Sequence, residues 1–340
     1  MNQQYKNLTK KTCLVTGGTG FIGSHLCAQL SELGAAVISV DIEGNKEGTY
    51  FKLLNGHRDI QTKIMDLSDS SSIKKIAKLK PDFLFHLSGL PYAPFTSIHP
   101  VSSFRSNVST TANMLEAARV TSAERFVLAS SACVFGATID SPIPINGNRS
   151  RPEHYYSYTK RQAESQAESY NEFYDVPISI CRFVNIYGPG DRHFGRLIPA
   201  LCRQLIELTT NELTLFRSSG ESVFEFLYVE DAVSGLLAAA IGEDSTFGIY
   251  HFGPGPMGRM KIIDIANKLS ILYDNRKRKL NAKATDGERT VQKYLDFEET
   301  VANIGWKPRW DLNTGLSSTV DWYRENITKI KPFNYSLHSI

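Results

Sequence analysis

The sequence contains few of the features that mark secreted, metal-binding or disulfide-rich proteins. Only five of its 340 residues are cysteines, an odd number, and none of them forms a C-x-x-C pair. Most of them lie within apolar runs, which predicts reduced thiols in a protein core and neither disulfides nor a metal site. They are Cys13, Cys27, Cys133, Cys181 and Cys202.

Long hydrophobic segments are also missing from the sequence. The chain begins MNQQYKNLTKKTCLVTGG, where lysines precede only a short apolar stretch. This pattern fits neither a signal peptide nor a membrane span. We therefore expect a cytoplasmic protein that does not interact with membranes.

An excess of charge of one sign is the third feature that the sequence lacks. The 38 Lys and Arg residues nearly balance 35 Asp and Glu residues, for a net charge of +3. The basic residues are scattered and are not interleaved with aromatic residues on one face, so we expect no nucleic-acid partner. With 41% hydrophobic residues, the composition is that of a globular protein and excludes a disordered or fibrous chain.

Short apolar runs alternate with longer helical patterns over the first 190 residues. The runs predict strands at 12–16, 36–41, 60–65, 83–87, 125–130 and 178–183. The helical patterns cover 22–33, 71–79, 101–120 and 154–174. Unbroken apolar strands that alternate with helices predict an α/β fold, a doubly wound parallel sheet of the Rossmann type.

The regular alternation of short apolar runs and helical patterns ends after Gly190. We expect residues 1–190 to form a cofactor-binding domain, to which segments near 224–253 return. Residues 191–330 then form a smaller, mixed substrate-binding lobe, and 331–340 form a tail.

A glycine-rich turn follows the first predicted strand and precedes the first predicted helix. Its residues Gly17, Gly20, Phe21, Ile22 and Gly23 fit a turn that brings backbone N–H groups close to a pyrophosphate. Asp41 ends the second predicted strand, where a carboxylate accepts hydrogen bonds from ribose hydroxyls and repels a 2′-phosphate. The sequence therefore predicts NAD as the cofactor, in preference to NADP.

A second G-x-G-x-x-G match lies at residues 253–258. Its prolines remove the N–H groups that a phosphate site needs, and Arg278 stands where an acidic residue is expected. We interpret this match as an ordinary loop.

Tyr156 and Lys160 are four residues apart on one predicted helix face. The apolar positions that continue this face predict that the pair is buried. A lysine ammonium near the phenol would lower the pKa of Tyr156 toward the range of a general base. Ser131, at the end of the fifth predicted strand, would hydrogen bond both the reacting hydroxyl and the Tyr156 oxygen.

The combined motifs resemble those of the NAD-dependent epimerase/dehydratase family, extended short-chain dehydrogenases/reductases that modify nucleotide sugars. The resemblance rests on residues 16–26, 130–136 and 182–190, on the Tyr156 and Lys160 pair, and on later landmarks such as 228–232 and 304–308. It implies that NAD stays bound while the C4 hydroxyl of a sugar is oxidised and the hydride is then returned. It also implies a homodimer that pairs the helices at 101–120 and 154–174.

The resemblance further implies the roles of single residues. It places Asp66, Leu67, Leu87 and Ser130 at the cofactor, Asn185 at the substrate diphosphate and Phe216 against a base. A locally satisfied turn residue is the alternative for Asn185, and a core residue is the alternative for Phe216.

The sequence departs from the family pattern at two places. Ala132 and Cys133 replace the Asp-Glu pair of dehydratases, so Cys133 is either an unusual catalytic acid or base, or a small core residue. Phe224 and Thr285 stand where many relatives have arginines for the diphosphate. The candidates for replacing those arginines are Arg192, Arg196, Arg217 and Arg289.

Four functions remain open from the sequence. A nucleotide-sugar 4-epimerase is favoured, followed by an unusual dehydratase that uses Cys133. The others are a dehydrogenase that releases a ketone and NADH, and a non-catalytic NAD-sensing protein. Ser131, Tyr156 and Lys160 argue against the last, because a sensor needs no proton-abstracting tyrosine.

Overall fold

The protein is described from a computed structural model. The structure describes residues 5–44, 46–56, 58–136, 141–207, 211–215, 220–242, 246–282, 291–333 and 335. In these ranges none of the helices combines the length and the hydrophobicity that a membrane span requires.

The centre of the described fold is a seven-stranded parallel sheet with the order β10-β6-β5-β4-β1-β2-β3. Its strands are β1 (Thr12–Thr16), β2 (Ala36–Asp41), β3 (Gln61–Ile64), β4 (Phe83–His86), β5 (Arg125–Ser131), β6 (Ile178–Phe183) and β10 (Phe247–Phe252). The predicted doubly wound α/β fold is confirmed, and β10 adds a strand that the apolar pattern did not indicate.

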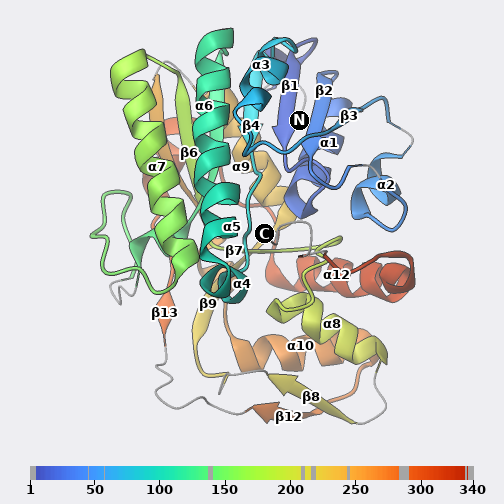
Figure 1. Ribbon diagram of the computed structural model, residues 1–340. Helices are drawn as coiled ribbons and strands as arrows, with labels where there is room; N and C mark the ends of the chain where they lie inside the picture. The colour runs from blue at the N-terminus through green and yellow to red at the C-terminus, as the bar shows by residue number, and fades with distance from the viewer. Residues whose placement is uncertain are drawn as a thin grey trace.

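Helices cover both faces of this sheet (Figure 1). On one face lie α1 (Phe21–Glu32) and α9 (Val229–Ile241), and on the other lie α3 (Ser71–Ala77), α6 (Thr110–Thr121) and α7 (Tyr155–Tyr174). Every residue of β4 and β6 is therefore buried, which explains why both strands are mostly apolar, with His86, Ser179 and Arg182 as the polar exceptions.

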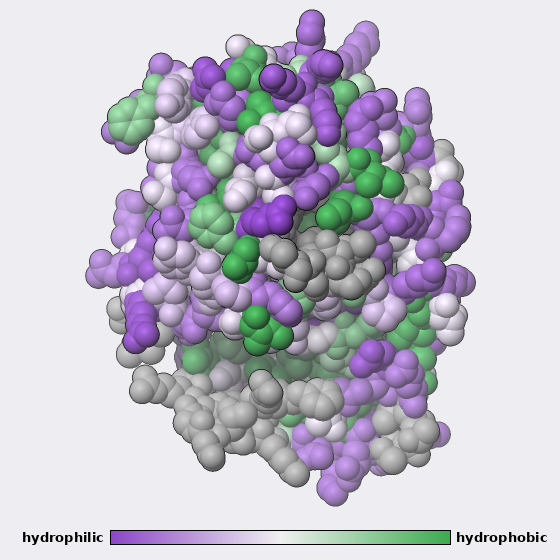
Figure 2. All heavy atoms as spheres, viewed as in Figure 1, coloured by the Kyte–Doolittle hydropathy of each residue, from purple (hydrophilic) through white to green (hydrophobic). Residues whose placement is uncertain are grey.

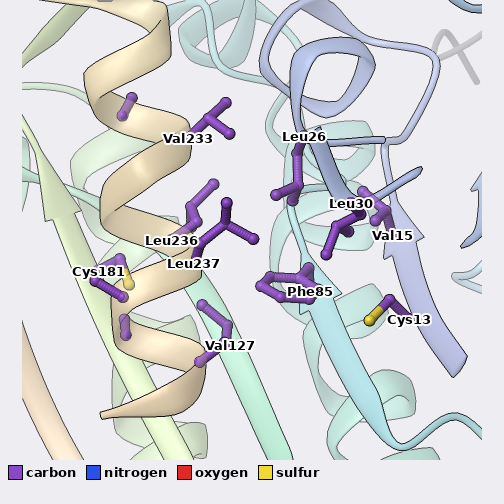
Figure 3. Close-up of a cluster of buried hydrophobic side chains, with 14 of the residues drawn as sticks. Cys13, Val15, Leu26, Leu30, Phe85, Val127, Cys181, Val233, Leu236 and Leu237 are labelled. Carbon is purple, nitrogen blue, oxygen red and sulfur yellow. The ribbon is translucent and has the colours of Figure 1, made fainter. Parts of the chain in front are cut away.

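The core beneath α1 and α9 fixes the position of the glycine-rich turn. Figure 3 shows side chains of the two helices facing one another above the strands, among them Val233, Leu236 and Leu237 of α9 and Leu26 and Leu30 of α1. This burial anchors α1 directly after the turn. All the cysteines are free and four of them are buried, as predicted, whereas Cys133 is partly exposed.

A smaller lobe lies below the large sheet in Figure 1. Its core joins α8 (Leu197–Glu207), α10 (Ile262–Asp274) and α12 (Leu312–Asn326). Its short strands are β8 (Glu212–Leu215), paired with β12 (Lys279–Ala282), and β9 (Val223–Tyr228), paired with β7 (Asn185–Tyr187), β11 (Arg259–Lys261) and β13 (Gln292–Lys293). Figure 2 shows a largely hydrophilic face, with hydrophobic residues in the hollow between this lobe and the rest of the protein.

Shorter elements complete the described chain. The α-helices are α2 (Tyr50–Asn55), α4 (Ala93–Ile98), α5 (Pro100–Phe104) and α11 (Glu298–Ile304). The 3₁₀ turns are η1 (Lys6–Leu8), η3 (Ala132–Phe135), η4 (Gly255–Gly258) and η5 (Ile327–Lys329). The second G-x-G-x-x-G match therefore ends in the 3₁₀ turn η4.

The helical stretch predicted at 101–120 is confirmed in extent, but it is not one regular α-helix. The structure instead divides this region into α5, a π-helical turn η2 (Arg105–Ser109) and α6. The π-helical turn holds Asn107, whose buried side chain contacts other segments of the chain, as described below.

Candidate active site

A cleft of about 730 Å³ lies at the carboxyl ends of the large sheet's strands. Its walls come from the β1–α1 turn, the ends of β2, β4 and β5, the start of α7, and the segment that enters the lobe. β1 and β4 are neighbours whose chain connections leave in opposite directions, and ligands bind at such a switch point in doubly wound sheets.

The glycine-rich turn has the geometry of a phosphate cradle. A Cβ atom at Gly23 would lie 2.1 Å from the Gly17 carbonyl oxygen, and a Cβ at Gly17, where φ is +67°, would lie 2.9 Å from the Ser88 nitrogen. No side chain caps the first turn of α1, so its N–H groups remain for an anionic ligand. Gly17, Gly20, Phe21, Ile22 and Gly23 all line the cleft.

Asp41 lies beside this turn at the end of β2. Its carboxylate accepts hydrogen bonds from the N–H groups of Thr19, at 3.2 Å, and Ile42, at 2.7 Å. Both bonds fix the carboxylate at the edge of the cleft. This arrangement fits a ribose with two free hydroxyls and disfavours a 2′-phosphate, as the sequence predicts for NAD.

The other residues expected at the cofactor also line the cleft, namely Asp66, Leu67, Leu87 and Ser130. Two of them have their own partners. The carboxylate of Asp66 accepts hydrogen bonds from the backbone and side chain of Ser68. The Ser130 hydroxyl donates to Glu164, which is fully buried and is paired with Arg182 at 2.9 Å.

Tyr156, Lys160 and Ser131 meet in the same cleft. The Lys160 ammonium donates to the Ala129 carbonyl at 2.7 Å and lies 5.9 Å from the centroid of the Tyr156 ring. The face of α7 that carries this pair is buried through Ala163 and Ala167, but Tyr174 at its end is exposed.

The expected lowering of the Tyr156 pKa by Lys160 is wrong for this structure. Burial raises the pKa of the phenol most, and the charge of Cys133 raises it further. Arg196 and a hydrogen bond with Ser131 lower the pKa. Burial also lowers the pKa of Lys160. Desolvation of the phenol therefore outweighs the effects of Arg196 and Ser131.

Asn107 positions α7, the helix that carries Tyr156 and Lys160, and was not predicted. Its amide donates to the Thr159 hydroxyl on α7 at 2.9 Å, and its carbonyl oxygen accepts from the Leu90 N–H at 2.6 Å. The π-helical turn brings this side chain between α7 and the segment after β4. A π-helical turn often marks a functional site, but the apolar spacing of 101–120 gave no signal of it.

His154 is a second positioning residue that sequence reasoning missed. Its Nδ1 accepts the Ser157 N–H at 3.1 Å and so caps α7 two residues before Tyr156. Its ring stacks against the Tyr156 ring, with centroids 5.9 Å apart. The sequence contains no signal of this role, because histidine is not among the usual N-capping residues and the predicted helix already began at residue 154.

Cys133 lines the cleft next to these groups. Burial raises the pKa of its thiol, while hydrogen bonds with Ser131 and Ser157 and the charge of Lys160 lower it. The net shift favours a protonated thiol, which can donate a proton but is a poor base.

The candidates for substrate binding divide into three groups. Asn185 lines the cleft and donates to the Glu225 carbonyl oxygen at 3.3 Å, and Arg196 lines it while paired with buried Asp191 at 3.1 Å. Arg192 also lines the cleft but is nearly buried in an ion pair with Glu43. Phe216, Arg217 and Arg289, together with Thr285, lie outside the described residues.

Phe224, which stands where many relatives have an arginine, lies on β9. Its side chain packs against the core of the lobe, next to buried Glu225 on the same strand.

Comparisons with known proteins agree with this geometry. A sequence model of the NAD dependent epimerase/dehydratase family matches residues 13–250. UDP-glucuronate 4-epimerase 4 of Arabidopsis thaliana is 28% identical, and the match covers 92% of this chain and 75% of that protein. The human dTDP-D-glucose 4,6-dehydratase is 25% identical, with 93% and 91% covered. Among solved structures, MoeE5 in complex with UDP-glucuronic acid and NAD is 25% identical and has a TM-score of 0.78, with 92% and 99% covered.

Proposed function

Because this chain belongs to the NAD-dependent epimerase/dehydratase family, we propose that it is a nucleotide-sugar 4-epimerase that acts through transient oxidation of the sugar's C4 hydroxyl. One observation carries the proposal: Ser131, Tyr156 and Lys160 line the same cleft as the glycine-rich turn and Asp41. A proton-accepting group and a dinucleotide site in one cleft are what a hydride-transfer reaction requires.

Each of these residues has its own role in the proposed reaction. The glycine-rich turn and Asp41 would hold NAD, which would supply the acceptor and later the donor of the C4 hydride. Tyr156 takes the proton of the C4 hydroxyl, and Ser131 orients that hydroxyl through its contact with the phenol. Lys160 holds the nicotinamide ribose, and the charge of Arg196 favours the phenolate form of Tyr156.

The acidic residues that line the cleft are bonded to other groups, and this favours epimerisation over dehydration. Elimination of water across C5 and C6 needs a base and an acid beside the sugar. Among the described residues that line the cleft, the acids are Asp41, Asp66 and Asp191, and each is bonded to a neighbouring group. The thiol of Cys133 is protonated, so it can supply only the acid.

Arg196 is the better of the two described arginine candidates for the substrate. Arg192 is neutralised by Glu43 and also donates to the Lys331 carbonyl oxygen. Arg196 has a more exposed side chain, and its charge acts on Tyr156. We therefore assign the anionic part of the substrate to Arg196, with Asn185 beside it.

We also propose a homodimer that forms through α4, α5 and α7. Ile98, Val101, Phe104 and Tyr158 are exposed on these helices, which pack against one another. Burying such an apolar face against a second copy would remove it from water.

The reaction is tested by incubating the purified protein with UDP-, GDP-, CDP- and dTDP-hexoses in deuterated water. NMR should show inversion at C4 without deuterium in the product. Deuterium at C5 with loss of the C6 oxygen would identify a dehydratase instead, and accumulating NADH would identify a dehydrogenase. No reaction with the whole panel, with NAD bound, would contradict the proposal.

A further inference from the structure

The end of the described chain crosses the cleft as a strap. We name residues 330–333 and 335 the C-terminal strap. Ile330 is buried in the core of the lobe. The Lys331 N–H then donates to the Gly48 carbonyl at 2.9 Å, and the Phe333 N–H donates to the Arg192 carbonyl at 3.1 Å. The strap thus connects the lobe to the loop after β2 and to the segment that enters the lobe.

Phe333 is the residue of the strap that lines the cleft. Its ring stacks on the His193 ring, with centroids 4.0 Å apart and an interplanar angle of 24°. His193 also lines the cleft. The two stacked rings therefore form a flat, largely apolar wall.

Tyr335 fastens the strap to the opposite side of the cleft. Its hydroxyl hydrogen bonds with Nδ1 of His193 at 2.8 Å. Its ring stacks on Phe95 of α4, with centroids 4.6 Å apart, and lies 6.0 Å from the Tyr92 ring. These contacts hold Phe333 against His193.

The wall faces the part of the cleft where the proposed chemistry takes place. Arg196 connects this wall to the reacting groups. It pairs at 3.1 Å with Asp191, whose carboxylate accepts the His193 N–H at 3.0 Å, and its charge acts on Tyr156. Tyr92, which stands 6.0 Å from Tyr335, also lines the cleft. The aromatic part of the strap therefore lies on the Arg196 side of the cleft, where the proposed function places the substrate.

We propose that Phe333 retains the keto-sugar intermediate, because its ring, held by Tyr335, forms the outer wall of the sugar subsite. The inference rests on the proposed 4-epimerase function. In that cycle the C4 hydroxyl becomes a ketone, and the enzyme must hold the ketone until the hydride returns to it. An aromatic ring packs against the C–H face of a sugar and excludes water, so the wall keeps the ketone in place.

The position of the wall is tested without any substrate by alkylating Cys133. This cysteine lines the cleft and is the one that is not buried. Because burial raises the pKa of its thiol, all variants are treated with iodoacetamide at one alkaline pH, and mass spectrometry follows the rate of labelling at Cys133. Phe333→Ala and Tyr335→Ala should each be labelled several-fold faster than the wild type. Met257→Ala removes an exposed side chain away from the cleft and should be labelled at the wild-type rate.

The retention of the ketone is tested with the nucleotide sugar that the wild type converts. Phe333→Ala should release NADH and a 4-keto sugar in place of much of the epimer, seen at 340 nm and by NMR. Met257→Ala should release neither.

The outcomes separate the two proposals. Unchanged labelling of both strap variants would overturn the wall, whatever the reaction is. If Phe333→Ala is labelled faster but forms epimer and 4-keto sugar in the same ratio as the wild type, Phe333 does not retain the ketone. A wild type that converts no sugar would contradict the proposed function and leave the labelling result as the test of the wall.

Discussion

Tyr156 shows how burial and charge oppose one another at a single residue. The enclosed site raises the pKa of the phenol, while Arg196 and Ser131 lower it. A phenol held neutral in the resting protein needs a cation close by to become a base. The pair of Tyr156 and Lys160 could be predicted from their spacing, but the contribution of Arg196 could not, since forty residues separate it from Tyr156.

Replacing Tyr156 by Phe removes the proton acceptor and keeps the ring. We expect turnover to fall at least about a hundredfold, the range typical for loss of a general base. NAD binding, measured by isothermal titration calorimetry, should stay close to wild type because the glycine-rich turn and Asp41 are untouched. Turnover at the wild-type rate would show that another group accepts the proton.

Cys133 provides the matched comparison for that experiment. Cys133→Ser and Cys133→Ala should retain turnover if the reaction is 4-epimerisation, since that reaction needs no further acid. Loss of turnover in both variants, with NAD still bound, would instead support the dehydratase alternative.

Glu225 gives a pH dependence that can be tested separately from catalysis. Burial raises its pKa from 4.5 to about 7, although Leu295 and Arg259 partly compensate. The folded protein therefore holds a proton here that the unfolded chain loses above pH 4.5. It follows that this residue's contribution to stability falls as the pH rises from 4.5 to 7.

The variant Glu225→Gln should lack this decline. At about 1.4 kcal/mol per pKa unit, the wild type should lose up to about 3 kcal/mol relative to the variant between pH 5 and 8 in urea unfolding. Glu221→Gln alters an exposed pair with Lys261 and should show little change. Parallel pH curves for Glu225→Gln and the wild type would contradict the assignment.

At the scale of elements, the sequence predicts long apolar strands best. The bounds 12–16, 36–41 and 178–183 agree with β1, β2 and β6, because each is an apolar run buried on both faces. The π-helical turn at 105–109 could not be predicted, because Asn107 is fixed by Leu90 and Thr159, which are distant in sequence. The strap was missed for the same reason, as its partners His193 and Phe95 lie in other segments.

The turn between β1 and α1 yields a prediction for an element. In Gly23→Ala the new Cβ would meet backbone atoms, the Gly17 oxygen at 2.1 Å and the Gly18 Cα at 2.7 Å. Because backbone cannot move aside, α1 must shift, and we expect a loss of about 2–3 kcal/mol of stability or more. NAD affinity, measured by calorimetry, should fall sharply.

Gly305→Ala is the control for this variant. Nothing lies within 4 Å of a Cβ at Gly305, although φ is +64° there. It should cost about 1 kcal/mol through backbone strain and leave NAD affinity unchanged. Equal NAD affinity in both variants would contradict the cradle.

At the scale of the whole molecule, the proposed dimer makes the large domain the site of assembly and leaves the lobe free. Val101 is 64% exposed on α5, so Val101→Glu should prevent pairing without disturbing the core. Light scattering after size-exclusion chromatography should then report a mass near 38.0 kDa, and twice that for the wild type. Leu53→Glu, at an exposed position of α2, should stay dimeric, and a monomeric wild type would contradict the dimer.

The place of β10 at the edge of the large sheet has a consequence for biosynthesis. β6 is complete at Phe183, but β10, which covers its outer edge, ends only at Phe252. A ribosome must therefore make α8, β8, β9 and α9 while the hydrogen-bonding edge of β6 stays open. Such an edge pairs readily with other nascent chains, so slow translation through this interval should favour aggregation.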